Sequence, residues 1–550
     1  MKLGLIVVLA AMLAASVSVA AFASDANPAS IEGTVSKDPG GEPLKKAIIE
    51  MIGEGQDEPA NYTATTEQDG HFKISGVRPG RYVVFVERTG FIAVDAHHHH
   101  QTEGIPISIE PGQQLKGIEL HMQPAAVLTG RVVDEDGDPM PNVNVAVLRR
   151  NLAGHGGQLD LVGADRTNDI GEYRLSGLPP GRYFISATPV LDFQSIATPS
   201  KDPAAQNKLQ LAYVATYYPN TTDRSQATTV ELRPGEETPI DFSLVRTPTA
   251  RLQGTVTNLG RTSHAVVALH SSESSLVFNE TDVGKDGKFE LRDVAPGSYT
   301  LMAIDDSGEQ PRIARQSIHV NGANLEGIRL APVLGATIRG QIRVAGRSNF
   351  DYSQISAYLQ PGDGNEEALN AAVHSGDAFH VKADGSFEWK NIPAGTYSIE
   401  AMSGKHAEWI IQSALLDGQD VADSEFAVSG GNLSLTITMT AESATIDGMV
   451  IDDKNQPVAG AVVVAVPPTR FRKRQSRYER TVTDQRGHFQ IRGIVPGDYS
   501  LFAWEAMEGN AYLDPDFLKQ YESRGTAIRL DRSAAKTVSL QVLPLPEDQP

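Results

Sequence analysis

Residues Gly487–Tyr499 read GHFQIRGIVPGDY, and this thirteen-residue pattern occurs five times along the chain. It consists of glycine, any residue, an aromatic, any, an apolar, two of any, an apolar, two of any, glycine, any, and tyrosine. The other copies are Gly70–Tyr82 (GHFKISGVRPGRY), Gly171–Tyr183 (GEYRLSGLPPGRY), Gly287–Tyr299 (GKFELRDVAPGSY) and Gly385–Tyr397 (GSFEWKNIPAGTY). The second glycines lie at positions 80, 181, 297, 395 and 497. A period of roughly one hundred residues indicates a tandem array whose units each fold around their own core.

Each copy has the alternation of two strands joined by a tight turn. Phe489 and Ile491 share one face of the first strand, and Tyr499 and Leu501 share one face of the second. We predict that these are core positions, and that the tyrosine hydroxyl binds a backbone group near the turn. Each copy also follows a strand-like segment that contains a glycine: Gly33, Gly130, Gly254, Gly340 and Gly448.

The composition favours a turn-rich β-protein. The 550 residues include 50 glycines and 32 prolines, a level that helical bundles do not carry. About seven short strands fit each unit, which is typical of a β-sandwich. We predict an all-β array of five seven-stranded β-sandwiches at residues 24–124, 125–247, 248–332, 333–440 and 441–550. Linkers of only a few residues predict a semi-rigid rod.

The N-terminus predicts export. Lys2 precedes an apolar run, and Ala21, Phe22 and Ala23 then form a small-x-small cleavage site before Ser24. We expect residues 1–23 to be a cleaved signal peptide, which leaves no membrane span; the alternative is a retained anchor. The chain has no cysteine, so thiol chemistry and disulfides are excluded. A net charge of −20 argues against nucleic-acid binding.

The repeated motifs resemble the carboxypeptidase regulatory-like domain. The resemblance rests on G-x-V-x-D-x-x-G-x-P, followed by D-G-x-F-x-I-x-G-L-x-P-G-x-Y-x-L, and is best at 128–187 and 446–503. It implies a transthyretin-like β-sandwich, related to collagen-adhesin B-type repeats and grouped with starch-binding-like folds. That family's module accompanies zinc carboxypeptidases without carrying their catalytic residues. The resemblance therefore implies a fold and assigns no activity.

Candidate binding residues lie where the units differ. One group is the basic segment Arg470–Arg480, which either is a solvated loop or clamps an acidic glycan, a phosphate-bearing lipid or an acidic neighbouring module. The other groups are aromatic and belong to insertions at Thr188–Thr222, where Pro203–Val214 looks helical, and at Glu505–Gly525. These aromatics either bind sugar rings or pack onto their own sandwiches. The predicted ligand-binding residues are Tyr213, Tyr217, Tyr218, Arg470, Arg472, Arg474, Arg477, Phe517 and Tyr521.

Catalytic and metal sites are not expected. The spacing His-x-x-Glu occurs twice, ending at Glu103 and Glu273, but outside the large α/β domain that a zinc carboxypeptidase needs. A histidine run at His97–His100 either binds metal adventitiously or is a polar loop. The segment Asp134–Asp138 (DEDGD) fails the calcium-loop pattern and looks like a strand-joining turn. We therefore predict no catalytic residues, no metal and no cofactor.

The function favoured by the sequence is non-catalytic binding or scaffolding at the cell envelope, in the periplasm or outside the cell. The expected ligand is carbohydrate or peptide, and an envelope protein is a candidate partner. The alternatives are a structural spacer or stalk, and an accessory subunit of a separately encoded hydrolase or transporter.

Overall fold

The computed structural model describes residues 28–53, 61–94, 104–150, 159–189, 210–260, 264–271, 277–306, 311–346, 350–362, 369, 379–403, 409–505, 507 and 510–544. Strands dominate these residues, and the predicted all-β fold is confirmed. Buried hydrophobic side chains form separate clusters, each confined to one unit of the repeat. We call these units modules one to five, at residues 28–124, 125–246, 247–332, 333–440 and 441–544. Residues 1–23, predicted to be a signal peptide, and the histidine run lie outside the described residues.

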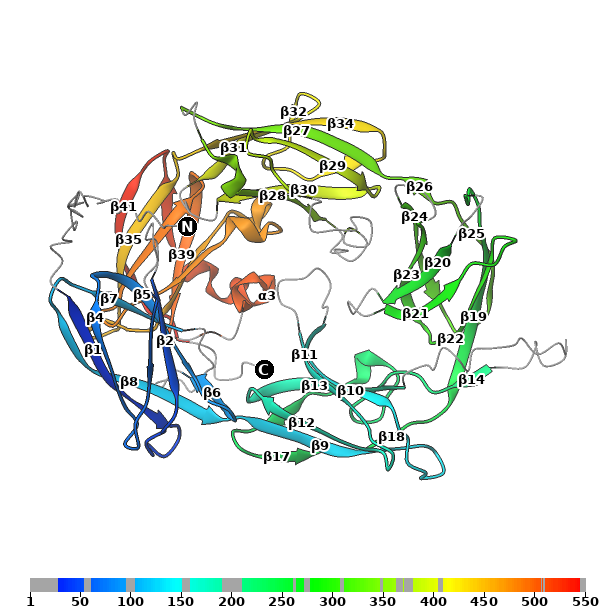
Figure 1. Cartoon of the computed structure of the whole chain (residues 1–550), viewed down its shortest axis with the longest axis horizontal. Helices are drawn as coiled ribbons and strands as arrows, with labels where there is room; N and C mark the ends of the chain where they lie inside the picture. The colour runs from blue at the N-terminus through cyan, green and yellow to red at the C-terminus, as the bar shows by residue number, and fades with distance from the viewer. Residues whose placement is uncertain are drawn as a thin grey trace, which may run out of the picture.

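Modules one and two each stack two sheets (Figure 1). Module one contains β1 (Ala29–Lys37), β2 (Ile48–Gly53), β3 (Tyr62–Thr65), β4 (His71–Val77), β5 (Gly80–Glu87), β6 (Phe91–Val94), β7 (Ile105–Ile109) and β8 (Gln114–Pro124). Module two contains β9 (Ala126–Val133), β10 (Val143–Arg150), β11 (Leu159–Arg166), β12 (Glu172–Leu178), β13 (Gly181–Pro189), β14 (Gln210–Ala212), β15 (Thr216–Tyr217), η1 (Arg224–Gln226), β16 (Val230–Leu232), β17 (Glu237–Pro239) and β18 (Phe242–Ser243). The expected helix at Pro203–Val214 is wrong where it can be checked, because Gln210–Ala212 is a strand paired with the start of module three.

Modules three and four repeat this plan. Module three contains β19 (Thr247–Val256), β20 (Ala265–Ser271), β21 (Val277–Asp282), β22 (Lys288–Val294), β23 (Gly297–Asp305), β24 (Arg312–Val320) and β25 (Leu325–Leu330). Module four contains β26 (Val333–Leu334), β27 (Ala336–Val344), η2 (Tyr352–Gln354), β28 (Ile355–Pro361), β29 (Ser386–Ile392), β30 (Gly395–Ser403), β31 (Ile410–Leu416), β32 (Gln419–Asp420), β33 (Phe426–Val428) and β34 (Asn432–Thr440). The short β26 pairs back onto β24 and so joins the two modules.

Module five has seven strands and an inserted helix. Its elements are β35 (Ala444–Ile451), β36 (Val462–Val466), η3 (Thr469–Phe471), η4 (Gln475–Arg477), β37 (Glu479–Val482), β38 (His488–Ile494), β39 (Gly497–Trp504), η5 (Ala511–Leu513), α3 (Pro515–Tyr521), η6 (Glu522–Arg524), β40 (Thr526–Leu530) and β41 (Ala535–Gln541). The sheet orders are β38-β35-β41 and β37-β36-β39-β40. Within the described residues, every helix is too short or too polar to cross a bilayer.

The glycine of each opening strand lies under the aromatic ring of the repeated motif. In module five, Gly448 of β35 is directly opposite Phe489 of β38, and a Cβ on Gly448 would lie 2.4 Å from that ring. The parallel closing strand β41 approaches from the other side, since the same Cβ would lie 2.7 Å from the carbonyl oxygen of Val538. The same register occurs in all modules, at Gly33/Phe72, Gly130/Tyr173, Gly254/Phe289, Gly340/Phe387 and Gly448/Phe489. The glycine is needed because ring and backbone together leave no room for a side chain.

The tyrosine that ends each motif is buried, and its hydroxyl binds the backbone four residues earlier. Tyr499, for example, donates to the carbonyl oxygen of Val495 at 2.9 Å. The acceptors in the other modules are Arg78, Pro179, Ala295 and Pro393, at 2.7, 2.8, 3.0 and 2.9 Å. The bond ties the turn to the core, and the prediction that each hydroxyl binds backbone near the turn is confirmed.

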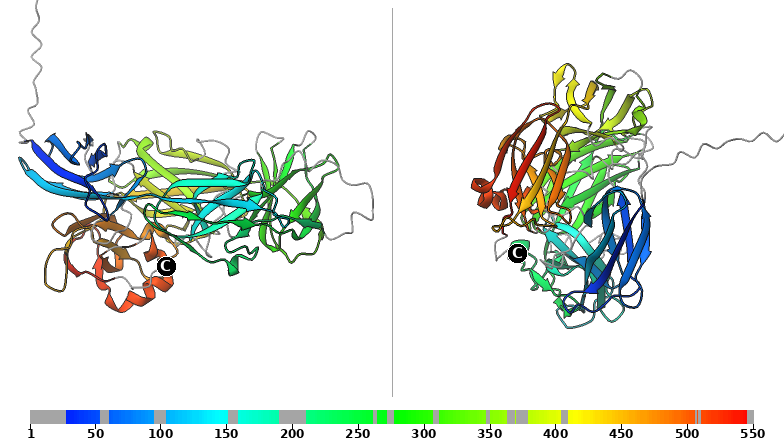
Figure 2. Two further views of the ribbon diagram at one scale, coloured as in Figure 1. Left: turned by 90° about the horizontal axis from the view of Figure 1, so that it is seen from below. Right: turned by 90° about the vertical axis from the view of Figure 1, so that its left-hand side faces the viewer.

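The modules are arranged around a ring (Figure 1). The sheets that contain β5, β13, β23, β30 and β39 face its inside, and α3 projects toward the centre. Modules one and five adjoin, as Figure 2 shows from two further directions, and Ser108 of module one donates a hydrogen bond to Asp484 of module five at 2.7 Å. The predicted rod is therefore wrong: the junctions turn in one direction, so the short linkers bring the two ends together.

Candidate functional site

The basic segment Arg470–Arg480 lies at the junction of modules four and five. It forms two 3₁₀ turns, η3 and η4, between β36 and β37. Arg474 reaches into module four, where it donates to the carbonyl oxygen of Ile399 at 2.9 Å and to Glu400 at 3.2 Å. Only 10% of the Arg474 side chain and 15% of the Glu400 side chain are exposed, so solvent screens this pair little.

The other arginines of the segment have different surroundings. Arg477 pairs with Asp423 of module four, and its guanidinium lies over the ring of Phe471 at 5.1 Å. Arg472 stays within module five and pairs with Glu522 at 2.7 Å. Arg470 is exposed, and its guanidinium lies 4.7 Å from the same Phe471 ring. Of the partners considered from sequence, the acidic neighbouring module is therefore the one that Arg474 and Arg477 contact in this structure.

Glu479 belongs to the same segment, and its surroundings disfavour the charged carboxylate. It is partly buried at the start of β37, near Tyr499, and burial raises its pKa to about 7 from a usual 4.5. The folded state therefore binds more protons than the unfolded state between about pH 4.5 and pH 7. The contribution of the Glu479 carboxyl to the free energy of unfolding therefore falls as pH rises through that window. Above about pH 7 the cost of burying the charged carboxylate applies in full.

Replacing Glu479 by glutamine is expected to stabilise module five by about 1–3 kcal/mol near pH 8, because the amide carries no charge to desolvate. Near pH 4 the variant and the wild type should be equally stable. Urea unfolding at pH 8 and at pH 4, followed by hydrogen exchange of peptides from β37 and β39, measures the stability of the variant and of the wild type. Equal stability of the two proteins at pH 8 would contradict the prediction.

The three tyrosines predicted in module two are not brought together into one platform. Tyr213 donates to Glu135 at 2.6 Å, and Arg246 lies 5.2 Å from its ring and 3.4 Å from the Glu135 carboxylate. The hydrogen bond from Tyr213 lowers the pKa of Glu135. Tyr217 packs against Leu148 and Leu159 on the face of the β10–β13 sheet that lies outside the main core cluster, while Tyr218 packs against that cluster. Sequence reasoning missed Glu135 and Arg246, which lie far from Tyr213 along the chain.

The two aromatics predicted in module five are buried, so of the two alternatives, sugar binding and packing onto their own sandwich, the structure has the packing. Phe517 and Tyr521 of α3 are 6% and 3% exposed. Their rings lie 5.6 and 5.5 Å from the ring of Trp504, which is fully buried on β39. The helix thus covers the second face of the β36–β39 sheet. This explains why all residues of β36 are buried: Val463 and Ala465 pack in the core between the sheets, and the three residues that alternate with them pack under α3.

Among the described residues, clefts lie at two of the junctions between consecutive modules. The cleft between modules four and five has a volume of about 510 Å³ and is lined by both signs of charge. Arg477 of module five pairs with Asp423 of module four across it, and Arg532 lies 3.4 Å from Glu442 of its own module. Its remaining lining is Ile410, Ile411, Gln412, Asp420, Ala422, Ser424, Thr440, Val495 and Pro496.

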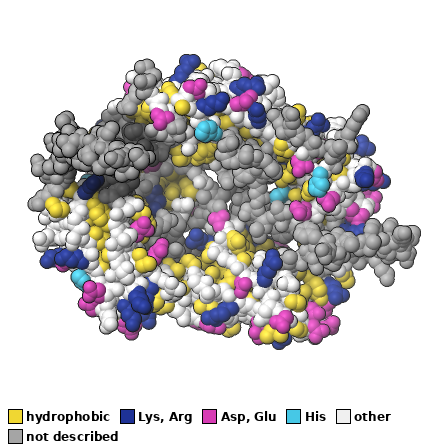
Figure 3. All heavy atoms as spheres, viewed as in Figure 1, with side chains coloured by type: hydrophobic (Ala, Val, Ile, Leu, Met, Phe, Trp, Pro, Cys, Tyr) yellow, Lys and Arg dark blue, Asp and Glu magenta, His cyan; other side chains and the backbone are white. Residues whose placement is uncertain are grey.

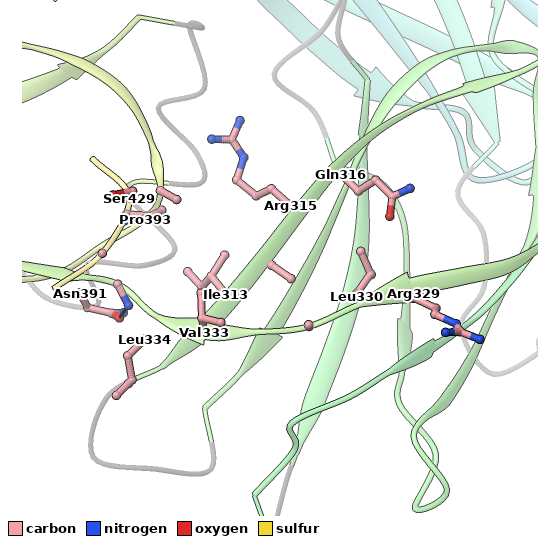
Figure 4. A pocket seen from close by; sticks show the side chains of 15 residues that line it. Ile313, Arg315, Gln316, Arg329, Leu330, Val333, Leu334, Asn391, Pro393 and Ser429 are labelled. Carbon is pink, nitrogen blue, oxygen red and sulfur yellow. Dashed lines mark hydrogen bonds between the residues drawn. The ribbon is translucent and has the colours of Figure 1, made fainter. Parts of the chain in front are cut away.

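The second cleft, of about 340 Å³, lies between modules three and four (Figure 4). Ile313, Val333 and Leu334 form its apolar wall, and Arg315 and Asn391 come to it from opposite modules. The side chains of Val333 and Leu334 are about half exposed, at 53% and 50%. The lining has no carboxylate, in contrast to the cleft between modules four and five.

Comparison with known proteins gives the family of three modules. The sequence profile of the carboxypeptidase regulatory-like domain matches residues 30–115, 127–245 and 445–510. These three segments are carboxypeptidase regulatory-like domains. The shared aromatic-over-glycine register and the tyrosine hydrogen bond extend the same structural plan to modules three and four.

A curated protein similar to this chain is colossin-A of Dictyostelium discoideum. It is 19% identical over 265 residues, which cover 44% of this chain and 2% of that protein. The chain therefore spans only a small part of the relative that it matches.

Solved structures with similar domains include three bacterial proteins. The Bacillus anthracis TIE protein is 15% identical, with 56% of this chain and 51% of that one covered, at a TM-score of 0.17. GBS52, the minor pilin of Streptococcus agalactiae, is 13% identical over 40% of this chain and 97% of its own, at 0.22. BcpA, the major pilin subunit of Bacillus cereus, is 10% identical over 56% of this chain and 99% of its own, at 0.16.

The strand-joining turns of the regulatory-like domains account for the aspartates considered as calcium ligands. Asp134 accepts hydrogen bonds from the backbone N–H groups of Asp136 and Asp138 at 3.0 and 2.9 Å. Asp452 does the same for Lys454 and Gln456 in module five, at 2.8 and 2.7 Å. Over the described residues, no three histidine or acidic side chains gather as a metal site would require.

Proposed function

We propose that this chain is an exported, non-catalytic scaffold of the cell envelope that binds extended peptide segments of envelope proteins. The cleft between modules four and five carries this proposal, because it offers both signs of charge beside apolar residues. A peptide also carries charges of both signs beside apolar side chains, and its charges can pair with Arg532 and Glu442.

Carbohydrate is the less favoured ligand. Sugar binding usually uses exposed aromatic rings, and Phe517 and Tyr521 are buried beneath the surface of module five. Charged side chains of both signs are interspersed over the face seen in Figure 3, a distribution that suits protein contacts more than a single polyanion.

A spacer or stalk is disfavoured by the ring. A stalk must hold its ends apart, whereas Ser108 and Asp484, from the first and last modules, are hydrogen-bonded at 2.7 Å. An accessory role beside a separate hydrolase or transporter is compatible with peptide binding, and co-purification from the native envelope distinguishes it.

The test is selection of phage-displayed peptides on the full chain, followed by fluorescence anisotropy of the selected peptides. Arg532→Ala is expected to weaken binding about fivefold, since losing one charge contact of about 1 kcal/mol has that effect. Arg529→Ala is the matched control, because Arg529 is an exposed arginine of the same module that does not line the cleft.

Three results would contradict the proposal. Equal effects of the two variants would remove the cleft from the binding site. Binding on a glycan array without any selected peptide would assign the carbohydrate alternative. Zinc-dependent peptidase or glycosidase turnover that survives repurification would overturn the non-catalytic assignment.

A further inference from the structure

The first and last modules meet through a small set of polar contacts. Ser108 and Glu110 of module one contact Asp484, Gln485 and Arg486 of module five. The Ser108 hydroxyl donates to Asp484 at 2.7 Å, and Arg486 donates to Glu110 at 2.7 Å. Asp484 is 2% exposed, so its contact is shielded from solvent.

Gln485 pairs with a strand edge as another strand would. Its amide nitrogen donates to the backbone carbonyl oxygen of Ser108 at 3.0 Å, and its amide oxygen accepts from the backbone N–H of Ser108 at 3.2 Å. Strand β7 is the last strand in the sheet order β3-β2-β5-β7, and edge strands present unpaired backbone groups of this kind. The Gln485 side chain therefore stands in for one residue of an added strand.

The turn that makes this contact is present in every module, but its central residues differ. Residues 484–487 read Asp-Gln-Arg-Gly. The carbonyl oxygen of Asp484 accepts from the N–H of Gly487, and its carboxylate accepts from the N–H of Arg486. The corresponding sequences are EQDG at 67–70, NDIG at 168–171, GKDG at 284–287 and KADG at 382–385. Only the copy in module five has glutamine followed by arginine, the two residues that reach module one.

This contact differs in kind from the junction of modules four and five. There, Arg474 is 10% exposed and is enclosed by module four. At the ring closure, Arg486 and Glu110 are 53% and 63% exposed, so salt screens their attraction. Each hydrophobic cluster of the described residues stays within one module, so no shared apolar core reinforces the closure.

We propose that Gln485 and Arg486 form a reversible intramolecular latch that binds the β7 edge of module one and closes the array into a ring. The covalent array supplies the high local concentration that so small a contact needs. The closed ring and the open array are then close in free energy. Salt, or substitutions at the turn, shift this equilibrium toward the open array. This inference does not depend on which ligand the clefts bind.

The test is distance measurement by pulsed electron paramagnetic resonance on the full chain. The protein has no cysteine, so Gln114→Cys and Lys454→Cys direct spin labels to two exposed sites, one in each module. Gln114 starts β8, just after the β7 edge, and Lys454 lies in a turn that packs beside residues 484–487. We expect a short-distance population that falls at least about fivefold in Gln485→Ala/Arg486→Ala, and that falls as salt rises from about 0.1 M to about 1 M.

The controls separate the latch from its alternatives. Asp484 is left intact because its carboxylate also accepts from the N–H groups of Arg486 and His488 and so holds the turn. Gln68→Ala changes the same turn position in module one, where Gln68 is exposed, and should leave the short distance unchanged. An unchanged distance in the double variant would overturn the proposal. Loss of the short distance on dilution with about a tenfold excess of unlabelled protein would also overturn it, because the contact would then join two copies.

Discussion

Replacing Gly130 by alanine is expected to destabilise module two by at least about 3 kcal/mol, the upper range for overpacking a core. A Cβ at this position would lie 1.8 Å from the carbonyl oxygen of Ile240 and 2.9 Å from the hydroxyl oxygen of Tyr173. Relief is difficult because Gly130 belongs to β9, which is paired on both sides, with β12 and with β17. Urea unfolding of the full chain, followed by hydrogen exchange of module two peptides, measures the loss.

Gly137→Ala is the control for this prediction. Gly137 lies in an exposed turn of the same module, and a Cβ there would meet nothing within 4 Å. Its φ of +85° makes alanine unfavourable by only about 1–2 kcal/mol. If both variants lost the same stability, the aromatic-over-glycine packing would not be the reason for the repeated glycine.

Replacing Tyr499 by alanine is expected to destabilise module five by about 3–5 kcal/mol, as for other buried aromatic residues. The ring is 6% exposed and belongs to the main core cluster of the module. Its hydroxyl also donates to the carbonyl oxygen of Val495, which would be left without that donor. The same unfolding measurement on module five peptides gives the value.

Tyr499→Phe separates the two contributions. It keeps the ring and removes the hydrogen bond, so it should destabilise the module by about 1 kcal/mol. A change near zero for Tyr499→Ala would show that the ring does not stabilise the core. A Tyr499→Phe loss as large as that of Tyr499→Ala would instead assign the stability to the hydroxyl.

Local pattern was enough to predict the core of each module. Side chains alternate along a strand, so Phe489/Ile491 and Tyr499/Leu501 had to share faces, and all four are buried. The partner of the Tyr499 hydroxyl lies only four residues away, so this bond was also within reach of sequence reasoning. The reason for Gly448 was not, since it depends on strand β41, which is about ninety residues further along the chain.

The candidate binding residues were predicted less well, because the sequence of a loop does not show which part of the fold its side chains pack against. For Phe517 and Tyr521 the sequence left sugar binding and packing onto their own sandwich both open. In the structure β36 and β39 present a second apolar face that α3 covers with these two residues. Arg474 was a candidate ligand-binding residue, and in the structure it contacts Glu400 of the neighbouring module. Its partner Glu400 lies 74 residues away along the chain and carries no motif that marks it.

The sequence by itself determined the repeat, the all-β modules and their core positions, because these follow from side-chain alternation and turn chemistry within about one hundred residues. Only the tertiary structure decided how the modules sit against one another. The ring, the clefts and the contact of Gln485 with Ser108 depend on contacts between modules, such as the pairing of β26 with β24 and of Arg474 with Glu400. The residues that make these contacts differ from one junction to the next, so no repeated pattern in the sequence marks them.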